Sequence, residues 1–147
     1  MKAWLKNTFA DAAWVPAAVV AFIAFTAKAF NVYILYPWLD MPTHFIGGAA
    51  IAYFFLATVA HSQKLVGAIP RIVQLACTLG LTAITAVIWE FLEHISDVAL
   101  GTNMNLGVSD TLFDLLFGLL GGAVMIVFAA RSVRFGRSIS SRAGNGA

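Results

Sequence analysis

The hydrophobic positions of this chain form four long runs that are separated by short polar stretches. Each run has at least about 20 residues, the length with which an α-helix crosses roughly 30 Å of hydrocarbon. The runs cover residues 14–36, 40–60, 70–97 and 109–130. The pattern therefore predicts an all-α, polytopic membrane protein, built as a bundle of four transmembrane helices.

Prolines and one serine mark the starts of these predicted helices. Pro16 and Pro42 fall in the opening turns of the first two runs, Pro70 opens the third, and the fourth begins near Ser109. Proline is tolerated in a first helical turn, and serine is a favoured N-cap residue. The breaks between the runs are therefore expected to be loops.

Composition excludes a water-soluble domain. The 147 residues are 61% hydrophobic and 11% charged, whereas a soluble domain has about 25% charged residues. The single cysteine, Cys77, lies inside an apolar run, so no disulfide framework is expected.

The two flanking segments differ from the predicted bundle. Residues 1–13 suit a short interfacial helix, and residues 131–147, rich in Arg, Ser and Gly, suit a mobile basic tail that contacts anionic lipid. A nucleic-acid partner is not expected. The N-terminal run also has features of a signal peptide, with small residues around 27–29, but its apolar stretch continues past that point to Trp38.

The cations are segregated to one side of the predicted bundle. Eight of the nine Lys and Arg residues lie before the first run, between the second and third, or after the fourth. Positively charged loops stay in the cytoplasm. We therefore expect a multi-pass protein of the bacterial inner membrane with both termini cytoplasmic.

Six of the seven acidic residues fall at the opposite ends of the last three runs, together with two histidines. Side chains three or four residues apart share one helix face, so each run carries one polar stripe. The stripes are Asp40 with His44, then Glu90, Glu93, His94 and Asp97, then Asp110 with Asp114. Glycines continue two of the stripes, at Gly47, Gly48, Gly118, Gly121 and Gly122. Small residues allow transmembrane helices to approach closely, so the stripes should face the bundle interior.

The negative charge of so many neighbouring carboxylates must be balanced. Two of them about 5 Å apart repel by roughly 3 kcal/mol at an effective dielectric constant near 20. Lys28 is the only cationic residue expected nearby, so the cluster must either share protons or bind a divalent metal ion. Zn, Mn and Fe all suit mixed nitrogen and oxygen ligands. The predicted ligands are His44, Glu90, His94 and Asp114, with Asp40, Glu93 and Asp110 as supporting residues or general bases.

Simpler roles exist for several of these residues. Asp40 and Asp110 can cap helix N-termini, and Glu93 and Asp97 can be solvated at a helix end. Glu90 and Asp114 are harder to explain in this way, because they lie one to two turns inside the membrane. Elsewhere, His61 is expected in a plain cytoplasmic loop, and Trp89 is expected to anchor the chain at the membrane interface.

Three segments of the sequence carry a family resemblance. They are Asp40-Met-Pro-Thr-His44-Phe45, Trp89-Glu90-Phe-Leu-Glu93 and Ser109-Asp110-Thr-Leu-Phe-Asp114. In this order the chain resembles the YjdF-type family of bacterial inner-membrane proteins and, more loosely, VanZ-like proteins. The chain is shorter than that pattern, with fewer spans. The resemblance supports a shared polar site and names no reaction.

The leading hypothesis from sequence is a metal site open to the extracytoplasmic leaflet, with a hydrolase or transferase acting on a lipid or its headgroup. A proton or cation transport component is a second reading. The cytoplasmic halves of the spans, which offer only Thr, Ser and Gln as polar groups, speak against it. A non-catalytic membrane subunit with a structural polar cluster is the third. The sequence leaves the oligomeric state open.

Overall fold

All regular elements in the described part of the chain are helical. The computed structural model describes residues 4, 6, 8–30 and 35–131, and within residues 24–30 it describes the backbone alone. The elements are η1 (Phe9–Ala13, a short π-helix), α2 (Trp14–Phe30), η2 (Pro37–Leu39, a 3₁₀ turn), α4 (Asp40–Val66), α5 (Arg71–Leu100) and α6 (Val108–Arg131). The predicted all-α bundle of four helices is confirmed. The predicted basic tail and part of the predicted interfacial segment lie outside the described residues.

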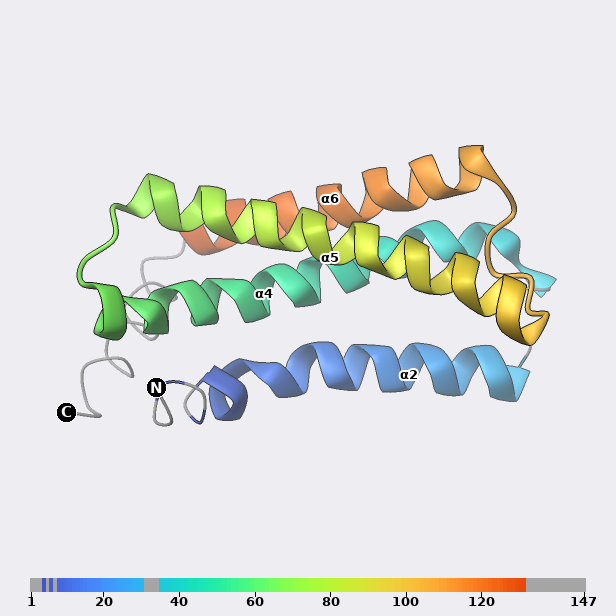
Figure 1. Ribbon diagram of the computed structural model, residues 1–147, viewed down its shortest axis with the longest axis horizontal. Helices are drawn as coiled ribbons and strands as arrows, with labels where there is room; N and C mark the ends of the chain where they lie inside the picture. Colours follow the sequence, from blue (N-terminus) through green and yellow to red (C-terminus); the bar gives the residue numbers. More distant parts are fainter. Residues whose placement is uncertain (1–3, 5, 7, 31–34, 132–147) are drawn as a thin grey trace.

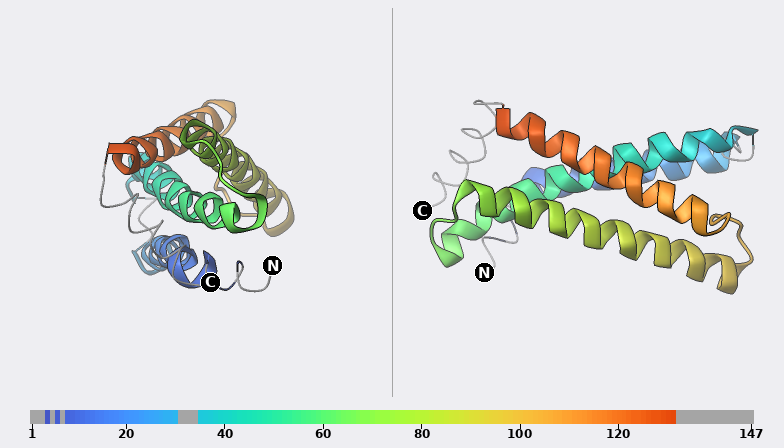
Figure 2. Two further views of the ribbon diagram at one scale, coloured as in Figure 1. Left: turned by 90° about the vertical axis from the view of Figure 1, so that its left-hand side faces the viewer. Right: turned by 90° about the horizontal axis from the view of Figure 1, so that it is seen from above.

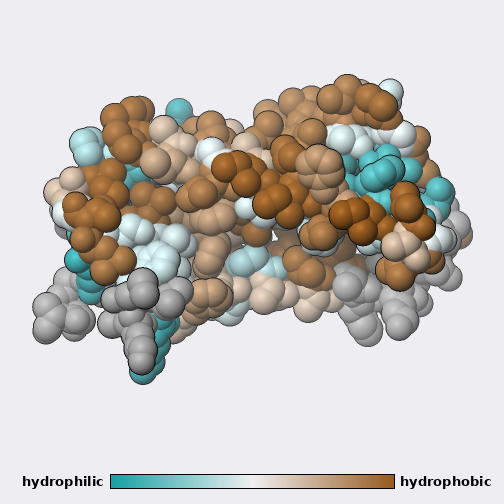
Figure 3. Space-filling view, in the orientation of Figure 1, coloured by the Kyte–Doolittle hydropathy of each residue, from teal (hydrophilic) through white to brown (hydrophobic). Residues whose placement is uncertain are grey.

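Three of the described helices are long and apolar enough to cross a membrane. They are Pro37–Val66, Arg71–Leu100 and Val108–Arg131, and a shorter apolar helix covers Phe9–Ile23. Large apolar side chains such as Phe91, Val98 and Phe128 are exposed on the outside of the helices. Brown, hydrophobic residues cover the middle of the face shown in Figure 3, and teal, hydrophilic residues gather toward the two ends. This outward apolar surface is suited to lipid rather than water.

The helices alternate in direction along the chain. The end of α2, the start of α4, the end of α5 and the start of α6 are therefore at the same end of the bundle, at the right of Figure 1. The contact between α4 and α6 is the most extensive, and α5 packs on both of these helices. Helix α2 lies at the outside of the bundle beside α4, as Figure 2 shows.

Glycine allows the close packing of α4 on α6. A Cβ atom on Gly48 would overlap the carbonyl group of Gly118, and one on Gly121 would overlap the carbonyl group of Phe45. The predicted role of small residues therefore applies at these positions. Gly47 is different, because a Cβ there would meet no atom within 4 Å.

Two helices extend beyond their predicted ends. Helix α4 continues to Val66 and stops at Gly67, where φ is 87°. Helix α5 continues to Leu100 and stops at Gly101, where φ is 68°. Glycine adopts a positive φ without steric cost, so Gly67 and Gly101 allow the chain to leave the helix at these points. The polar residues near position 61 suggested an earlier end, but they are accommodated within the last turns of α4.

Candidate metal centre

Three helices bring four ionisable side chains together at the end of the bundle where α4 begins. His44 comes from α4, Glu90 and Glu93 from α5, and Asp114 from α6. Each offers one ligand atom, and these atoms all lie within 4.8 Å of one another. The close glycine contact between α4 and α6 lies directly beside the cluster, since the His44 carbonyl oxygen is 3.8 Å from the position of a Cβ on Gly118. We call these four residues the central cluster.

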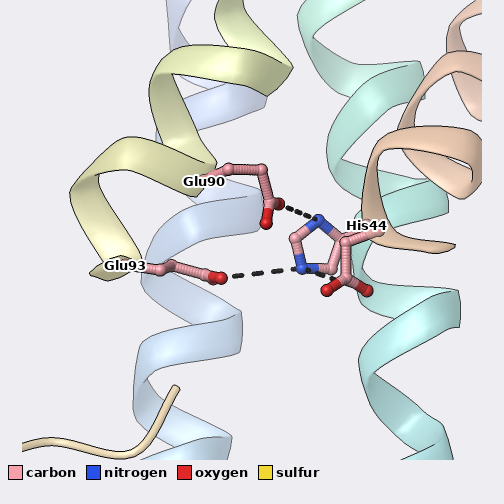
Figure 4. A group of neighbouring side chains, drawn as sticks. His44, Glu90 and Glu93 are labelled. Atoms are coloured by element: carbon pink, nitrogen blue, oxygen red, sulfur yellow. Dashed lines mark ion pairs between the residues drawn. The ribbon is translucent and has the colours of Figure 1, made fainter. Parts of the chain in front are cut away.

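The imidazole of His44 faces the carboxylates of Glu90 and Glu93 (Figure 4). Its Nδ1 is 3.8 Å from Glu90 Oε1, and its Nε2 is 3.9 Å from Glu93 Oε1. The same Nε2 is 3.7 Å from Asp114 Oδ1 and 3.5 Å from Asp40 Oδ1. These separations exceed those of ordinary hydrogen bonds, which are about 2.7–3.2 Å. The imidazole is therefore surrounded by carboxylates without being tightly bonded to any one of them.

The carboxylates of the central cluster are buried. Glu90 is 7% exposed, Glu93 is 6% exposed and Asp114 is 2% exposed. Within the described part of the chain, Glu90 Oε2 is buried and has no hydrogen-bond partner. Leaving a buried polar group unpaired costs about 1–3 kcal/mol, and more for a charged one. This oxygen therefore needs a proton or a cation.

Trp89 holds Glu93 in place. The Trp89 indole Nε1–H donates a hydrogen bond of 2.7 Å to Glu93 Oε1. The two residues are four apart on α5, the spacing at which helical side chains meet. Trp89 was predicted only as an interfacial anchor, and its contact with the site was missed. The four-residue spacing to Glu93 is the signal that could have revealed it.

The placement of His94 differs from its predicted role as a ligand. His94 is exposed and stands in neither group of potential ligands in the described residues. Consecutive residues on an α-helix point about 100° apart, so Glu93 and His94 face different directions. Glu93 is the one that faces the interior, where it is buried and its Oε1 lies 3.9 Å from His44 Nε2. Glu93 thus takes the place that the spacing argument had given to His94.

A second group of carboxylates adjoins the central cluster. Asp40, Asp110 and Asp114 also offer ligand atoms within 4.8 Å of one another, and Asp114 belongs to both groups. Asp40 and Asp110 are more exposed than Asp114. Asp110 Oδ2 accepts a hydrogen bond of 2.8 Å from the Leu106 N–H, so this residue also supports the turn that leads into α6.

Asp97 organises the loop between α5 and α6. Its carboxylate accepts hydrogen bonds from the Thr102 hydroxyl at 2.6 Å, the Met104 N–H at 2.8 Å and the Asn105 N–H at 2.9 Å. Asp97 stands in neither group of potential ligands. The predicted stripe on α5 therefore divides into Glu90 and Glu93, which face the cluster, and Asp97, which fixes the loop beside it.

His61 lies at the other end of the bundle, and its prediction as part of a plain loop was wrong. It belongs to α4 and is 2% exposed. Its Nδ1 is 3.2 Å from Thr8 Oγ1, and its Nε2 is 3.5 Å from Asp11 Oδ2. His61 therefore joins α4 to the segment that contains η1. Polar residues at the end of a span looked like a loop because the sequence does not reveal that this segment folds back onto them.

The fold and its apolar surface define an integral membrane protein. Residues 1–134 match the family described as "Predicted membrane protein (DUF2238)", and the chain belongs to this family. The resemblance to YjdF-type proteins is consistent with this membership.

The chain is also similar to a protein of Thermotoga maritima that is described as "Uncharacterized protein". The two are 34% identical over 99 residues, which cover 65% of this chain and 50% of the relative. The chain thus spans about half the length of that relative. No solved structure matches the chain.

Proposed function

We propose that this protein binds a divalent metal ion through His44, Glu90, Glu93 and Asp114, and that the metal serves hydrolysis or group transfer on a membrane lipid or its headgroup. The observation that carries the proposal is the central cluster itself. Four potential ligand atoms from three helices lie within 4.8 Å of one another. One buried oxygen, Glu90 Oε2, has no hydrogen-bond partner in the described part of the chain.

The donor set supports a transition metal. One imidazole nitrogen and several carboxylate oxygens suit Zn²⁺, Mn²⁺ or Fe²⁺, with bonds of about 2.0–2.2 Å in the case of zinc. The contacts of His44 Nε2 with Asp40, Glu93 and Asp114, at 3.5–3.9 Å, approach the separations between neighbouring ligands of one ion. Glu90 contacts the other ring nitrogen, Nδ1, so its side chain must shift toward the Nε2 side for all four residues to bind one ion.

The site is proposed to open toward the extracytoplasmic leaflet of the bacterial inner membrane. The support is the segregation of eight of the nine Lys and Arg residues to the opposite ends of the predicted spans. Tyr36 and Trp38 are exposed beside the start of α4, where aromatic side chains suit the level of the lipid headgroups. A metal at this depth would face the ester and phosphoryl groups of those headgroups.

Such a metal would supply a nucleophile. A bound Zn²⁺ lowers the pKa of its water to about 7, which provides hydroxide at neutral pH. Asp40 and Asp110 are more exposed than the central carboxylates, so they suit the acceptance of the water proton. The metal would activate water for attack on an ester or phosphoryl group, and Asp40 or Asp110 would return the accepted proton to the leaving oxygen.

Reconstitution into liposomes tests the proposal in two separable parts. The full chain is purified without chelators, its metal content is measured, and the protein is placed in phospholipid vesicles. We expect about one metal ion per chain or more, together with headgroup or acyl products that disappear after chelation and return with the metal. A chain without bound metal would overturn the site. A metal-loaded chain that releases no product from any phospholipid class would overturn the catalytic part.

Transport of protons or cations receives less support. The hydroxyls of Thr78 and Thr82 are buried between the two ends of the bundle, and each donates to a carbonyl group of its own helix. These hydroxyls already have partners, so they do not require a water chain. We therefore favour a site that acts at one face of the membrane.

A further inference from the structure

The two groups of potential ligands share one residue. Asp114 stands in the central cluster with His44, Glu90 and Glu93, and it also stands with Asp40 and Asp110. We propose that a second divalent cation binds between Asp40, Asp110 and Asp114, so that Asp114 bridges two metal ions. This inference rests on the proposed function, because it adds a second ion to the same site, where Asp40 and Asp110 then serve as ligands instead of proton acceptors.

The geometry around His44 places the two groups in direct contact. His44 Nε2 is 3.7 Å from Asp114 Oδ1, the shared carboxylate, and 3.5 Å from Asp40 Oδ1, which belongs only to the second group. Two-metal sites hold their ions about 3.5–4 Å apart. A carboxylate shared by the two groups, as Asp114 is, can bridge two metal ions at this separation.

The combined cluster also contains one buried oxygen without a hydrogen-bond partner among the described residues. The Glu90 side chain is 8% exposed and points toward His44 (Figure 4). Its Oε2 is buried and has no hydrogen-bond partner in the described part of the chain. A cation bound within the combined cluster would supply the partner that this oxygen lacks.

The charge of the cluster also favours two cations over one. The two groups contain five carboxylates, Asp40, Glu90, Glu93, Asp110 and Asp114. Their ion pairs among the described side chains are with His44 alone. When ionised, these five carboxylates carry a charge of −5 among themselves, and the side chain of Lys28, the cation expected nearby, lies outside the described residues. One divalent ion offsets two of these charges, and two ions offset four. Like charges in a partly dry site are costly, and the second ion removes most of the remaining repulsion.

The ligand chemistry of the second position differs from that of the first. The central cluster offers an imidazole, whereas the second group offers only carboxylate oxygens. Oxygen ligands alone suit hard cations such as Mg²⁺ and Mn²⁺. Mn²⁺ also accepts imidazole, so it suits both positions and serves as the probe.

A titration of the full, metal-stripped chain with Mn²⁺ tests the inference. We expect two Mn²⁺ ions per chain, with an electron paramagnetic resonance spectrum that shows magnetic coupling between them. The Asp110→Asn variant should bind one Mn²⁺ and lose the coupling. Its amide oxygen can still accept the hydrogen bond that Asp110 receives from Leu106 N–H, so the turn before α6 is preserved. The Asp40→Asn variant should behave in the same way.

Asp11→Asn is the control, because Asp11 lies beside His61 at the opposite end of the bundle. It should leave both ions in place. A single Mn²⁺ in the unaltered chain would overturn the second position while leaving the proposed function standing. No bound Mn²⁺, Zn²⁺ or Fe²⁺ would overturn the proposed function as well. Two ions that remain coupled in both Asp110→Asn and Asp40→Asn would overturn the assignment of their ligands.

Discussion

Helix α4 carries a histidine near each end, and the two have opposite surroundings. His61 meets one hydroxyl and one carboxylate, at 3.2 Å from Thr8 Oγ1 and 3.5 Å from Asp11 Oδ2. His44 meets four carboxylates at 3.5–3.9 Å. Both side chains are largely enclosed by protein. At His61 each of the two ring nitrogens has one partner. At His44 four carboxylates surround an imidazole that has only two ring nitrogens, so the acceptors outnumber the possible donors.

The comparison shows what distinguishes a structural polar contact from a candidate binding site. At His61 the partners come from a neighbouring segment, and they fasten it to α4. At His44 they come from three helices, and one of them keeps an unpaired buried oxygen. Burial of an ionisable group is common to both ends, so burial alone does not identify the site. The excess of carboxylates identifies it.

Among the substitutions that test this comparison, replacement of Asp114 should have the largest effect, because it should weaken metal binding at the His44 end. Asp114→Asn removes one negative charge and one proposed ligand from the central cluster. Loss of a residue that only supports a ligand lowers metal affinity by about 10–100-fold. Loss of a ligand itself should lower it by at least about 100-fold. Calorimetric titration of the stripped protein with Mn²⁺ or Zn²⁺ measures the change. Asp97→Asn is the matched control, since Asp97 belongs to the α5–α6 loop. Equal losses in both variants would contradict the assignment.

The glycine contact that supports the site gives a prediction about stability. Gly48→Ala would place a methyl group against the Gly118 carbonyl. The Gly118 backbone cannot rotate out of the way as a side chain could, so α4 and α6 must separate. Overpacking of this kind costs about 1–3 kcal/mol of stability. Gly47→Ala meets open space and should leave stability nearly unchanged. Thermal unfolding in detergent compares the two variants, and similar midpoints would show that the helices are not closely packed here.

Loss of the Trp89 hydrogen bond should weaken metal binding without abolishing it. Trp89→Phe removes the N–H that orients Glu93, and residues that support a ligand are worth about 10–100-fold in metal affinity. Trp38→Phe, at an exposed position beside the start of α4, is the control and should leave affinity unchanged. If Trp89→Phe binds metal as tightly as the unaltered chain, Trp89 serves only as an interfacial anchor.

The smallest predicted effect concerns the end of the bundle near His61. His61→Leu removes the contact with Thr8 and should destabilise the attachment of the Phe9–Ala13 segment by about 0.5–1.5 kcal/mol, the net value of one hydrogen bond. Hydrogen exchange should become faster in this segment and stay unchanged around His44. Unchanged exchange at Phe9–Ala13 would mean that apolar packing alone holds it.

The fold could be predicted from sequence because its cause is local. Long apolar runs with prolines at their starts determine four helices whatever their packing partners are. His44, Glu90 and Asp114 could be predicted as interior residues for a related reason, since charge at membrane depth must avoid lipid. Each of these inferences needed only one helix at a time.

The remaining features depend on how helices are rotated and paired. Spacing placed Glu93 and His94 on one broad stripe, and only the packing of α5 against α4 and α6 decides which of them faces inward. The enclosure of His61 requires the N-terminal segment to fold back, which no periodicity within α4 indicates. The sharing of Asp114 between two groups is likewise a property of three helices together.

The most direct test is the bound metal per chain in the unaltered protein and in two variants, His44→Gln and His61→Gln, purified side by side without chelators. Elemental analysis should find metal in the unaltered protein and in His61→Gln, and little in His44→Gln, with all three folded by circular dichroism. Absence of metal from the unaltered protein, or equal metal in the two variants, would contradict a metal site at His44.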